Sequence, residues 1–339
     1  MTAIQYSIFL PVRNGGAYIK DCVASILDQD YHDFELHILD NCSTDGTADW
    51  VETVTDPRVR LWRSDRPLSM VESWARIKDV PKREFMTTIG HDDLFDRGFL
   101  AIMTDLIQRN PEASLFQTGA RYINAHGKSI RSCKPIPVRE TAPQFFAAQL
   151  QYSRDVFGTG YVMRSTDYER LGGIPPFERL LFADNALWML LARQSWKAAD
   201  PRVAISIRIH NQSESASMPS LWPSFLKGLE QFVDFLDGYL REDTAARAVF
   251  EESGPAFMLR YHRSLYIYAL LEACQQRRTI APEVQPQIWA SLRKGAPAVA
   301  EQLTSSTTIK ILQLFNRSPF RTVIPILWKI YQGIRTRSF

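Results

Sequence analysis

The sequence predicts an α/β fold in which a mixed, mostly parallel sheet is flanked by helices and is followed by an all-helical C-terminal extension. Strand-like apolar runs alternate with helical stretches over the first 95 residues, giving four strands and three helices. From about residue 219 onward, only helical spacing of apolar residues remains. Such alternation is typical of a parallel sheet with right-handed crossovers, so the carboxyl ends of its strands should gather at one edge.

Each expected element follows from a local pattern. Short runs rich in β-branched and apolar residues predict strands at 6–12, 34–39, 59–63 and 85–89. Apolar residues three or four positions apart predict helices at 17–27, 43–54 and 69–78. The same rules predict a helix at 99–107, a strand at 115–123, a strand-like run at 156–163, a helix from 187 and a strand at 203–209. Helices at 226–240, 245–274 and 284–292 and a last pair after residue 308 complete the chain.

Composition and charge exclude some classes of protein. The chain has 339 residues, 45% hydrophobic and 23% charged, as expected of an ordinary globular protein. A net charge of +3 is too small to predict a nucleic-acid partner. No acidic residue follows Glu301, whereas six Lys and Arg do, so the preceding residues carry a net charge of −3. The basic character is therefore confined to the C-terminal tail.

The four cysteines show no paired spacing, which favours neither a disulfide framework nor a zinc site and fits a reducing compartment. The sequence runs directly into an apolar strand at its start, without the pattern of a signal peptide. No run of about 18 uninterrupted apolar residues is present, so no membrane-spanning helix is expected. We expect a cytoplasmic protein that can contact the inner face of the cell membrane.

Polar residues follow three of the predicted strands. Arg13, Asp40 and Asp92 come directly after separate strands, and ligands of open α/β sheets bind beyond such ends. The neighbouring carboxylates of Asp92 and Asp93 repel each other, and a cation would stabilise them. Oxygen ligands favour Mg²⁺ or Mn²⁺, which commonly carries a phosphate. The alternative is that both aspartates cap a helix starting near Phe95, and Asp40 has the alternative of stabilising a turn.

These blocks resemble the family-2 inverting glycosyltransferases, whose nucleotide-binding fold is called GT-A. The resemblance lies in Ile-Phe-Leu-Pro-Val-Arg-Asn-Gly at 8–15, Ile-Leu-Asp-Asn-Cys-Ser-Thr-Asp-Gly-Thr at 38–47 and Gly-His-Asp-Asp at 90–93, in matching order and separation. It implies a glycosyltransferase domain at 1–215, with a nucleotide-binding half at 1–95 and an acceptor half at 96–215. Residues 216–339 would form a helical region outside the shared core.

The resemblance also implies roles for individual residues. Pro11, Arg13 and Asp40 would line the base and ribose of the donor nucleotide. Asp92 matches the last acid of the family's D-x-D motif and would hold a metal that bridges the donor diphosphate. His210, in a basic-x-His segment, would reach the same metal or diphosphate. The remaining expected donor-binding residues are Asn14, His91 and Asp93. The alternatives are that His91 is a surface histidine in a loop and that His210 is a structural histidine at a strand end.

Asp184 matches the second position of the family's acidic pair and would be the general base that takes the proton of the acceptor hydroxyl. Its alternative role is a helix N-cap, and the two roles can coexist. Ala183 and Gly90 depart from the family by replacing expected acids. The implied function is transfer of a sugar from a nucleotide-sugar, a UDP-sugar by expectation, to a glycan or lipid-linked acceptor in polysaccharide synthesis. A non-catalytic nucleotide-sugar-binding protein is the alternative, and a nucleotidyltransferase is a more distant one.

The final segment contains an amphipathic pattern. Seven apolar residues line one helical face, with basic residues away from it, and such a helix binds membrane surfaces or packs on neighbouring helices. They are Phe320, Val323, Ile324, Leu327, Ile330, Tyr331 and Ile334.

Overall fold

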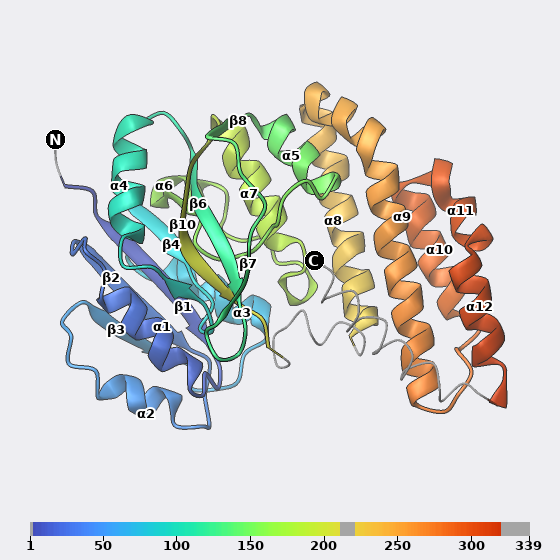
Figure 1. The fold of residues 1–339 in the computed structure, drawn as a ribbon, viewed down its shortest axis with the longest axis horizontal. Helices are drawn as coiled ribbons and strands as arrows, with labels where there is room; N and C mark the ends of the chain where they lie inside the picture. The colour runs from blue at the N-terminus through green and yellow to red at the C-terminus, as the bar shows by residue number, and fades with distance from the viewer. Residues whose placement is uncertain (1–2, 211–220, 320–339) are drawn as a thin grey trace. The chain divides into compact units, whose positions relative to one another are not determined.

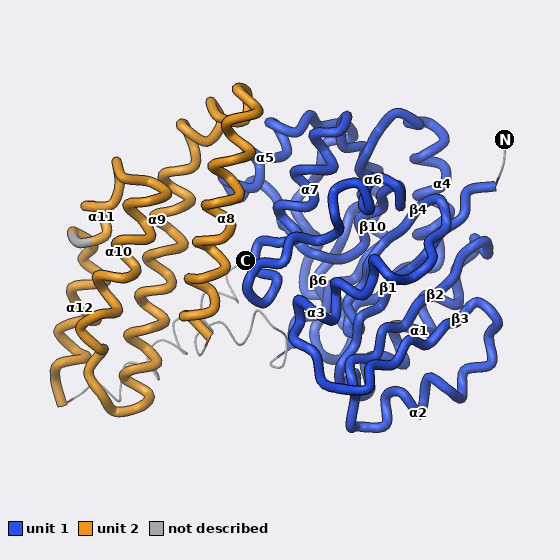
Figure 2. Tube along the Cα trace, turned by 180° about the vertical axis from the view of Figure 1, so that it is seen from behind, with its two compact units in different colours: residues 1–210 blue, residues 211–339 orange. Residues whose placement is uncertain are grey.

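A computed structural model describes residues 3–210 and 221–319 of the chain (Figure 1). Its contacts divide the chain into two compact units, Met1–His210 and Asn211–Phe339 (Figure 2). The expected boundary at residue 215 and the expected membrane-binding face after residue 319 lie outside the described residues. The functional division of residues 1–215 into a donor half and an acceptor half stays a prediction.

The first unit is built on one mixed sheet of ten strands. Its main path runs β3-β2-β1-β4-β9-β6-β10-β5, with β7 beside β6 and β8 beside β10. The bounds are β1 Tyr6–Val12, β2 Phe34–Asp40, β3 Val59–Arg63, β4 Phe85–Thr88, β5 Leu94–Phe95, β6 Leu115–Ile123, β7 Ser129–Ser132, β8 Arg139–Glu140, β9 Val162–Arg164 and β10 Lys197–Arg208. The first four strands pair in parallel, as do β6 and β10, whereas β5, β7, β8 and β9 are antiparallel to their partners.

Helices cover both faces of this sheet because side chains alternate along each buried strand. Ile8 and Leu10 of β1 belong to one apolar cluster with helices α1 and α4, whereas Phe9 belongs to a second cluster with α7. The helical segments of the unit are α1 Tyr18–Leu27, α2 Thr47–Glu52, α3 Met70–Ala75, η1 Arg76–Asp79, α4 Phe99–Arg109, α5 Ala142–Leu150, α6 Ser165–Arg170, η2 Glu178–Leu180 and α7 Ala183–Gln194. The expected fold class is confirmed.

Three local predictions are wrong. The run 156–163 is not one strand: β9 begins only at Val162, because Gly160 has a positive φ of 72° that breaks an extended chain. The alternative in which Asp92 and Asp93 cap a helix starting near Phe95 is wrong, since Leu94 and Phe95 pair with β10 and the helix begins at Phe99, the predicted position. The helix expected from residue 187 begins four residues earlier, at Ala183.

The second unit is helical throughout its described part. Its helices are α8 Trp222–Glu242, α9 Thr244–Gln275, α10 Val284–Gly295, η4 Pro297–Val299, α11 Ala300–Ser305 and α12 Thr307–Asn316. Helix α9 contacts α8, α10 and α12 and so forms the centre of the unit. Among the described residues, no helix is long and apolar enough to cross a bilayer.

Candidate active site

The carboxyl ends of β1, β2 and β4 lie at one edge of the sheet because these neighbouring strands are parallel. Asp40 is the last residue of β2 and lies beside Val12, the last residue of β1. Its Oδ2 accepts a hydrogen bond from the Ser43 amide (3.2 Å), whereas its buried Oδ1 has no hydrogen-bond partner in the described structure. An unpaired buried carboxylate oxygen is costly, so this atom is available to a donor group of a ligand.

Asn14 joins the loops that follow β1 and β2. Its amide donates to the Ser43 hydroxyl at 2.9 Å, and its side-chain oxygen accepts from the Thr44 amide at 2.8 Å. The contacts hold the two loops together and leave the neighbouring Arg13 side chain exposed. Pro11 is buried and is the next-to-last residue of β1, so it supports the end of this strand from the protein interior.

Asp92 and His210 meet at this edge. Nε2 of His210 lies 2.8 Å from Oδ2 of Asp92, although the two residues are far apart in the sequence. Both side chains are mostly buried, with exposures of 8% for His210 and 19% for Asp92. His91 lies close enough to both for their charges to influence its pKa, which burial lowers. The structure therefore brings together the two residues expected to hold a metal.

Asp93 has a different environment from its neighbour. Its carboxylate is buried and accepts a hydrogen bond from the backbone N–H of Arg208 at 2.9 Å. Burial, with the nearby charge of Asp92, raises the pKa of Asp93 to about 8. These contacts make Asp93 a residue that positions the end of β10, and its direct contact with a donor stays a prediction.

Arg208 and Tyr18 complete the surroundings of His210. Nε of Arg208 donates to the carbonyl oxygen of Asp92 at 2.8 Å, and its guanidinium carbon lies 4.7 Å from the centre of the Tyr18 ring. The ring of Tyr18 lies 4.8 Å from that of His210. The basic-x-His segment is evident in the sequence, whereas no motif marks Tyr18. The only available signal was its place at the start of the first crossover helix, next to the glycine turn.

Asp184 lies in the first turn of α7. The N-cap of this helix is Phe182, with a left-handed φ of 62°, so the alternative role of Asp184 as an N-cap is wrong. Burial raises the pKa of Asp184, although the residue is partly exposed as a whole. Its carboxylate faces Gly158, where an added Cβ would lie only 3.3 Å from Oδ2. A carboxylate with a raised pKa is suited to accept a proton near neutral pH.

The segment facing Asp184 is tied to the end of β4. Thr88 Oγ1 donates to the carbonyl oxygen of Gly158 at 3.3 Å, and the Gly90 amide donates to Thr159 Oγ1 at 3.3 Å. Gly90 itself faces Oδ1 of Asp92, since an added Cβ there would lie 2.9 Å from that atom. This chain of contacts connects the surroundings of Asp184 with those of Asp92.

Oδ2 of Asp92 and Nε2 of His210 are within hydrogen-bond distance of each other, and the same separation would suit two adjacent ligands of one divalent cation. Adjacent ligands of an octahedral ion with bonds of about 2.1 Å lie roughly 3 Å apart, close to the observed 2.8 Å. No group of three or more His, Cys, Asp or Glu is arranged to hold a metal within the described residues. A cation at this pair would need oxygens of a phosphate ligand and water to complete its shell, which is the usual arrangement for Mg²⁺.

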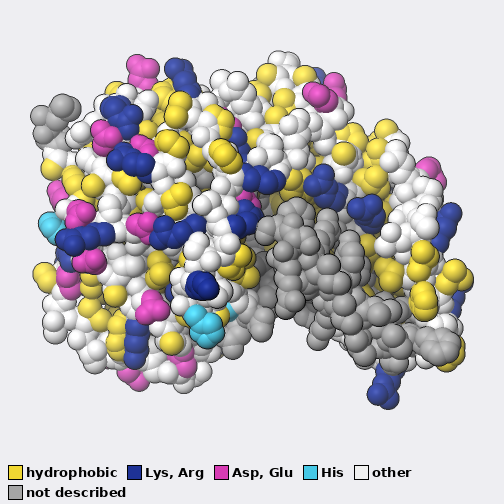
Figure 3. All heavy atoms as spheres, viewed as in Figure 1, with side chains coloured by type: hydrophobic (Ala, Val, Ile, Leu, Met, Phe, Trp, Pro, Cys, Tyr) yellow, Lys and Arg dark blue, Asp and Glu magenta, His cyan; other side chains and the backbone are white. Residues whose placement is uncertain are grey.

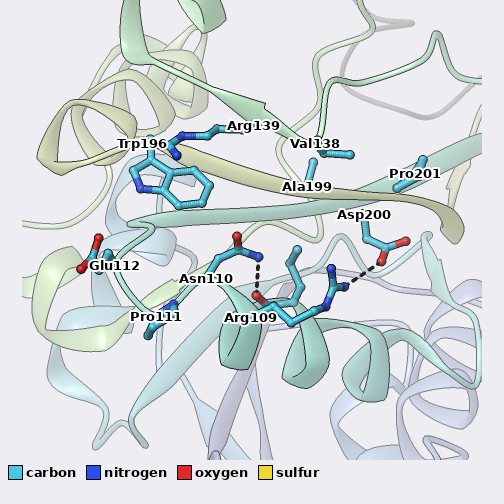
Figure 4. Close-up of a pocket in the computed structure, with 11 residues that line it drawn as sticks. Arg109, Asn110, Pro111, Glu112, Val138, Arg139, Trp196, Ala199, Asp200 and Pro201 are labelled. Carbon is cyan, nitrogen blue, oxygen red and sulfur yellow. Dashed lines mark hydrogen bonds and ion pairs between the residues drawn. The ribbon is translucent and has the colours of Figure 1, made fainter.

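A cavity of about 700 Å³ lies elsewhere in the unit (Figure 4). It adjoins Pro111, Trp196 and Asp200, near the amino ends of β6 and β10, whereas Arg208 and His210 follow the carboxyl end of β10. Its Arg109 lies 3.4 Å from Asp200. The cavity is thus separate from the edge that carries the predicted residues.

Comparisons with known proteins identify the family of this chain. Residues 7–165 match the family described as Glycosyl transferase family 2. A Bacillus subtilis protein named "Putative teichuronic acid biosynthesis glycosyltransferase TuaG" is 49% identical over 194 residues, which cover 57% of this chain and 73% of TuaG. The chain belongs to glycosyltransferase family 2.

Solved structures share the fold. Staphylococcus aureus TarS (residues 1–349) superposes with a TM-score of 0.60 at 13% identity, covering 97% of this chain and 92% of that one. The mannosyltransferase PcManGT of Pyrobaculum calidifontis, solved with GDP-Man and Mn²⁺, gives 0.54 at 16% identity, covering 96% and 87%. At these identities the likeness establishes the GT-A fold alone. The chain also matches three further curated relatives, and these matches cover only 13%, 35% and 38% of the relatives' own length.

Proposed function

We propose that this glycosyltransferase moves a sugar from a UDP-sugar to an acceptor hydroxyl with inversion at the anomeric carbon. The observation that carries the proposal is the position of Asp40, Asp92 and His210 at one strand edge, with the surroundings of Asp184 tied to it. A nucleotide base at Asp40 would donate an N–H to the unpaired Oδ1, as the imide of uracil can. TarS has been solved with UDP-GlcNAc, which supports this choice of base.

Asp184 is proposed as the general base. The acceptor oxygen forms the new bond to the anomeric carbon while its proton passes to the Asp184 carboxylate. The bond between that carbon and the diphosphate oxygen breaks on the opposite face, and its electron pair leaves with the nucleotide. One displacement from the opposite face inverts the anomeric centre.

Asp92 and His210 are proposed to hold Mg²⁺ or Mn²⁺ with the donor diphosphate. A bound divalent ion supplies charge neutralisation for the leaving group. Arg13, Asn14 and His91 would bind the donor around it, with the exposed guanidinium of Arg13 able to stack on a base or reach a phosphate.

We further propose that the acceptor is a glycan or lipid-linked glycan of a surface polysaccharide and that the reaction takes place in the cytoplasm. The likeness to TuaG supports the acceptor class. Free thiols at all four cysteines are compatible with a reducing compartment.

Turnover and donor binding by two variants test the proposal. Asp184→Asn should lower turnover by about 10² to 10⁴ while leaving the affinity for a UDP-sugar within twofold, because only the proton acceptor is lost. Asp92→Ala should instead weaken UDP-sugar binding in the presence of Mn²⁺, measured by calorimetry. Unchanged turnover in Asp184→Asn would remove this residue from the mechanism, and unchanged affinity in Asp92→Ala would remove the metal site.

A further inference from the structure

Helix α12 of the second unit carries apolar side chains on two faces. One face packs against α9 and is buried. It consists of Ile309, Leu312 and Asn316. The opposite face leaves three large apolar side chains in solvent: Ile311 (47% exposed), Leu314 (70%) and Phe315 (42%).

This second face is unusual within the molecule. The described residues contain seven exposed large hydrophobic side chains, and three of them lie within five consecutive positions of α12. Scattered apolar side chains on a surface need no explanation, but a contiguous group indicates an interaction surface. Figure 3 shows hydrophobic side chains, in yellow, on the part of the surface where Figure 1 places α12.

Basic side chains border the exposed face. Lys310 and Arg317 are seven residues apart on α12, so they lie along one side of the helix, and both are exposed. Two further exposed arginines, Arg277 and Arg278, lie at the end of α9 near the C-terminal end of α12, where Asn316 Nδ2 donates to the carbonyl oxygen of Arg278 at 3.1 Å. Two cations of α12 therefore border the exposed apolar group.

All charged residues after Glu301 are basic. Residues 320–339 contribute four of them. A protein partner that covers an apolar patch does not require this bias, whereas an anionic bilayer does, since it attracts basic side chains and takes up apolar ones at the headgroup boundary. The charge complementarity selects a lipid surface with negative headgroups as the occupant.

We propose that the outward face of α12, formed by Ile311, Leu314 and Phe315 with Lys310 and Arg317 beside it, docks the protein on an anionic membrane surface. The apolar side chains enter the headgroup boundary and the cations contact phosphate or carboxylate headgroups. This inference goes beyond the proposed function, because it assigns a surface in the second unit and does not depend on the sugar-transfer site.

Vesicle sedimentation with the full chain tests the docking surface. Wild-type protein should bind phosphatidylcholine vesicles containing about one third phosphatidylserine, bind vesicles of phosphatidylcholine alone much less, and lose affinity as salt is raised. The triple variant Ile311→Ser, Leu314→Ser, Phe315→Ser should lose at least about tenfold in affinity. The double variant Lys310→Gln, Arg317→Gln should lose more than about tenfold, since each basic residue near such a surface contributes roughly fivefold.

A matched control removes exposed apolar side chains elsewhere. Ile130→Ser with Val138→Ser changes side chains that are 50% and 65% exposed in the first unit, and should bind vesicles as the wild type does. Absence of wild-type binding, or full binding by the triple variant, would overturn the proposal. Two other results, each with unchanged vesicle binding, would also overturn it. Dissociation of an oligomer by the triple variant would show that another copy of this chain covers the face. A loss of several degrees of Tm would show that another segment of the same chain covers it.

Discussion

Nε2 of His210 lies 2.8 Å from Oδ2 of Asp92 across 118 residues of sequence. The pair forms because β5, which follows Asp92 and Asp93, is antiparallel to β10, which ends at Arg208. A hydrogen bond of 2.9 Å from the backbone N–H of Arg208 to the Asp93 carboxylate stabilises this pairing of β5 with β10. The two residues proposed to hold a metal are thus positioned by the sheet itself.

Tyr18 should position His210. Replacing Tyr18 with Leu removes the ring that contacts both the Arg208 guanidinium and the His210 imidazole. We expect the affinity for Mn²⁺ with a UDP-sugar to fall about tenfold, the size of a partly buried cation–π contact. Tyr18→Phe keeps the ring and should restore the affinity. Calorimetry measures both, and equal losses in the two variants would indicate that the hydroxyl group matters instead.

Gly158 should be required for the position of Asp184. An alanine there would place Cβ 3.3 Å from Oδ2 of Asp184 and push the carboxylate by a few tenths of an ångström. Because proton transfer depends on sub-ångström placement, we expect Gly158→Ala to lower kcat about tenfold with little change in KM for the donor.

The matched control for this substitution is Gly238→Ala, at a position in α8 where an added Cβ meets nothing within 4 Å. It should leave kcat unchanged and stabilise the helix by up to about 1 kcal/mol. If Gly158→Ala behaved in the same way, Asp184 would tolerate displacement.

The pH dependence of the reaction should follow Asp184. A general base works only when it is deprotonated, and burial raises the pKa of this carboxyl group. The rate should therefore fall as pH decreases through a value above the ordinary carboxyl pKa of about 4. Profiles of kcat/KM against pH measure this limb, and a limb at or below the ordinary value would contradict the assignment.

A buried cluster of three charged side chains should contribute strongly to the free energy of unfolding of the first unit. Glu140 pairs with Arg154, and its Oε2 lies 2.9 Å from Nζ of Lys197, whose side chain is fully buried. Glu140→Gln would leave two buried cations without an anion and should destabilise the fold by about 3 to 5 kcal/mol, whereas Lys197→Met removes the excess charge and should be nearly neutral. Urea unfolding of the two variants measures the contrast.

The same group predicts a pH effect. Burial lowers the pKa of Lys197 to about 8, so between about pH 8 and the unfolded value of about 10.4 the unfolded chain binds a proton that the native protein does not. The free energy of unfolding contributed by Lys197 should therefore rise with pH across this window. The difference between wild type and Lys197→Met, measured at pH 8 and pH 10.4, isolates this contribution, and a constant difference would contradict it.

The sequence by itself determined the first four parallel strands, the change to helices after about residue 219 and the family, because these follow from local periodicity and from short blocks that each lie at one strand end. It also pointed to Asp92, His210 and Asp184, through the resemblance. Only the tertiary structure decided that Asp92 meets His210, that Tyr18 and Arg208 surround them, and that Asp93 turns inward to β10. These contacts depend on strand order and on the insertion of β9 between β4 and β6, and no local pattern specifies which distant strands become neighbours.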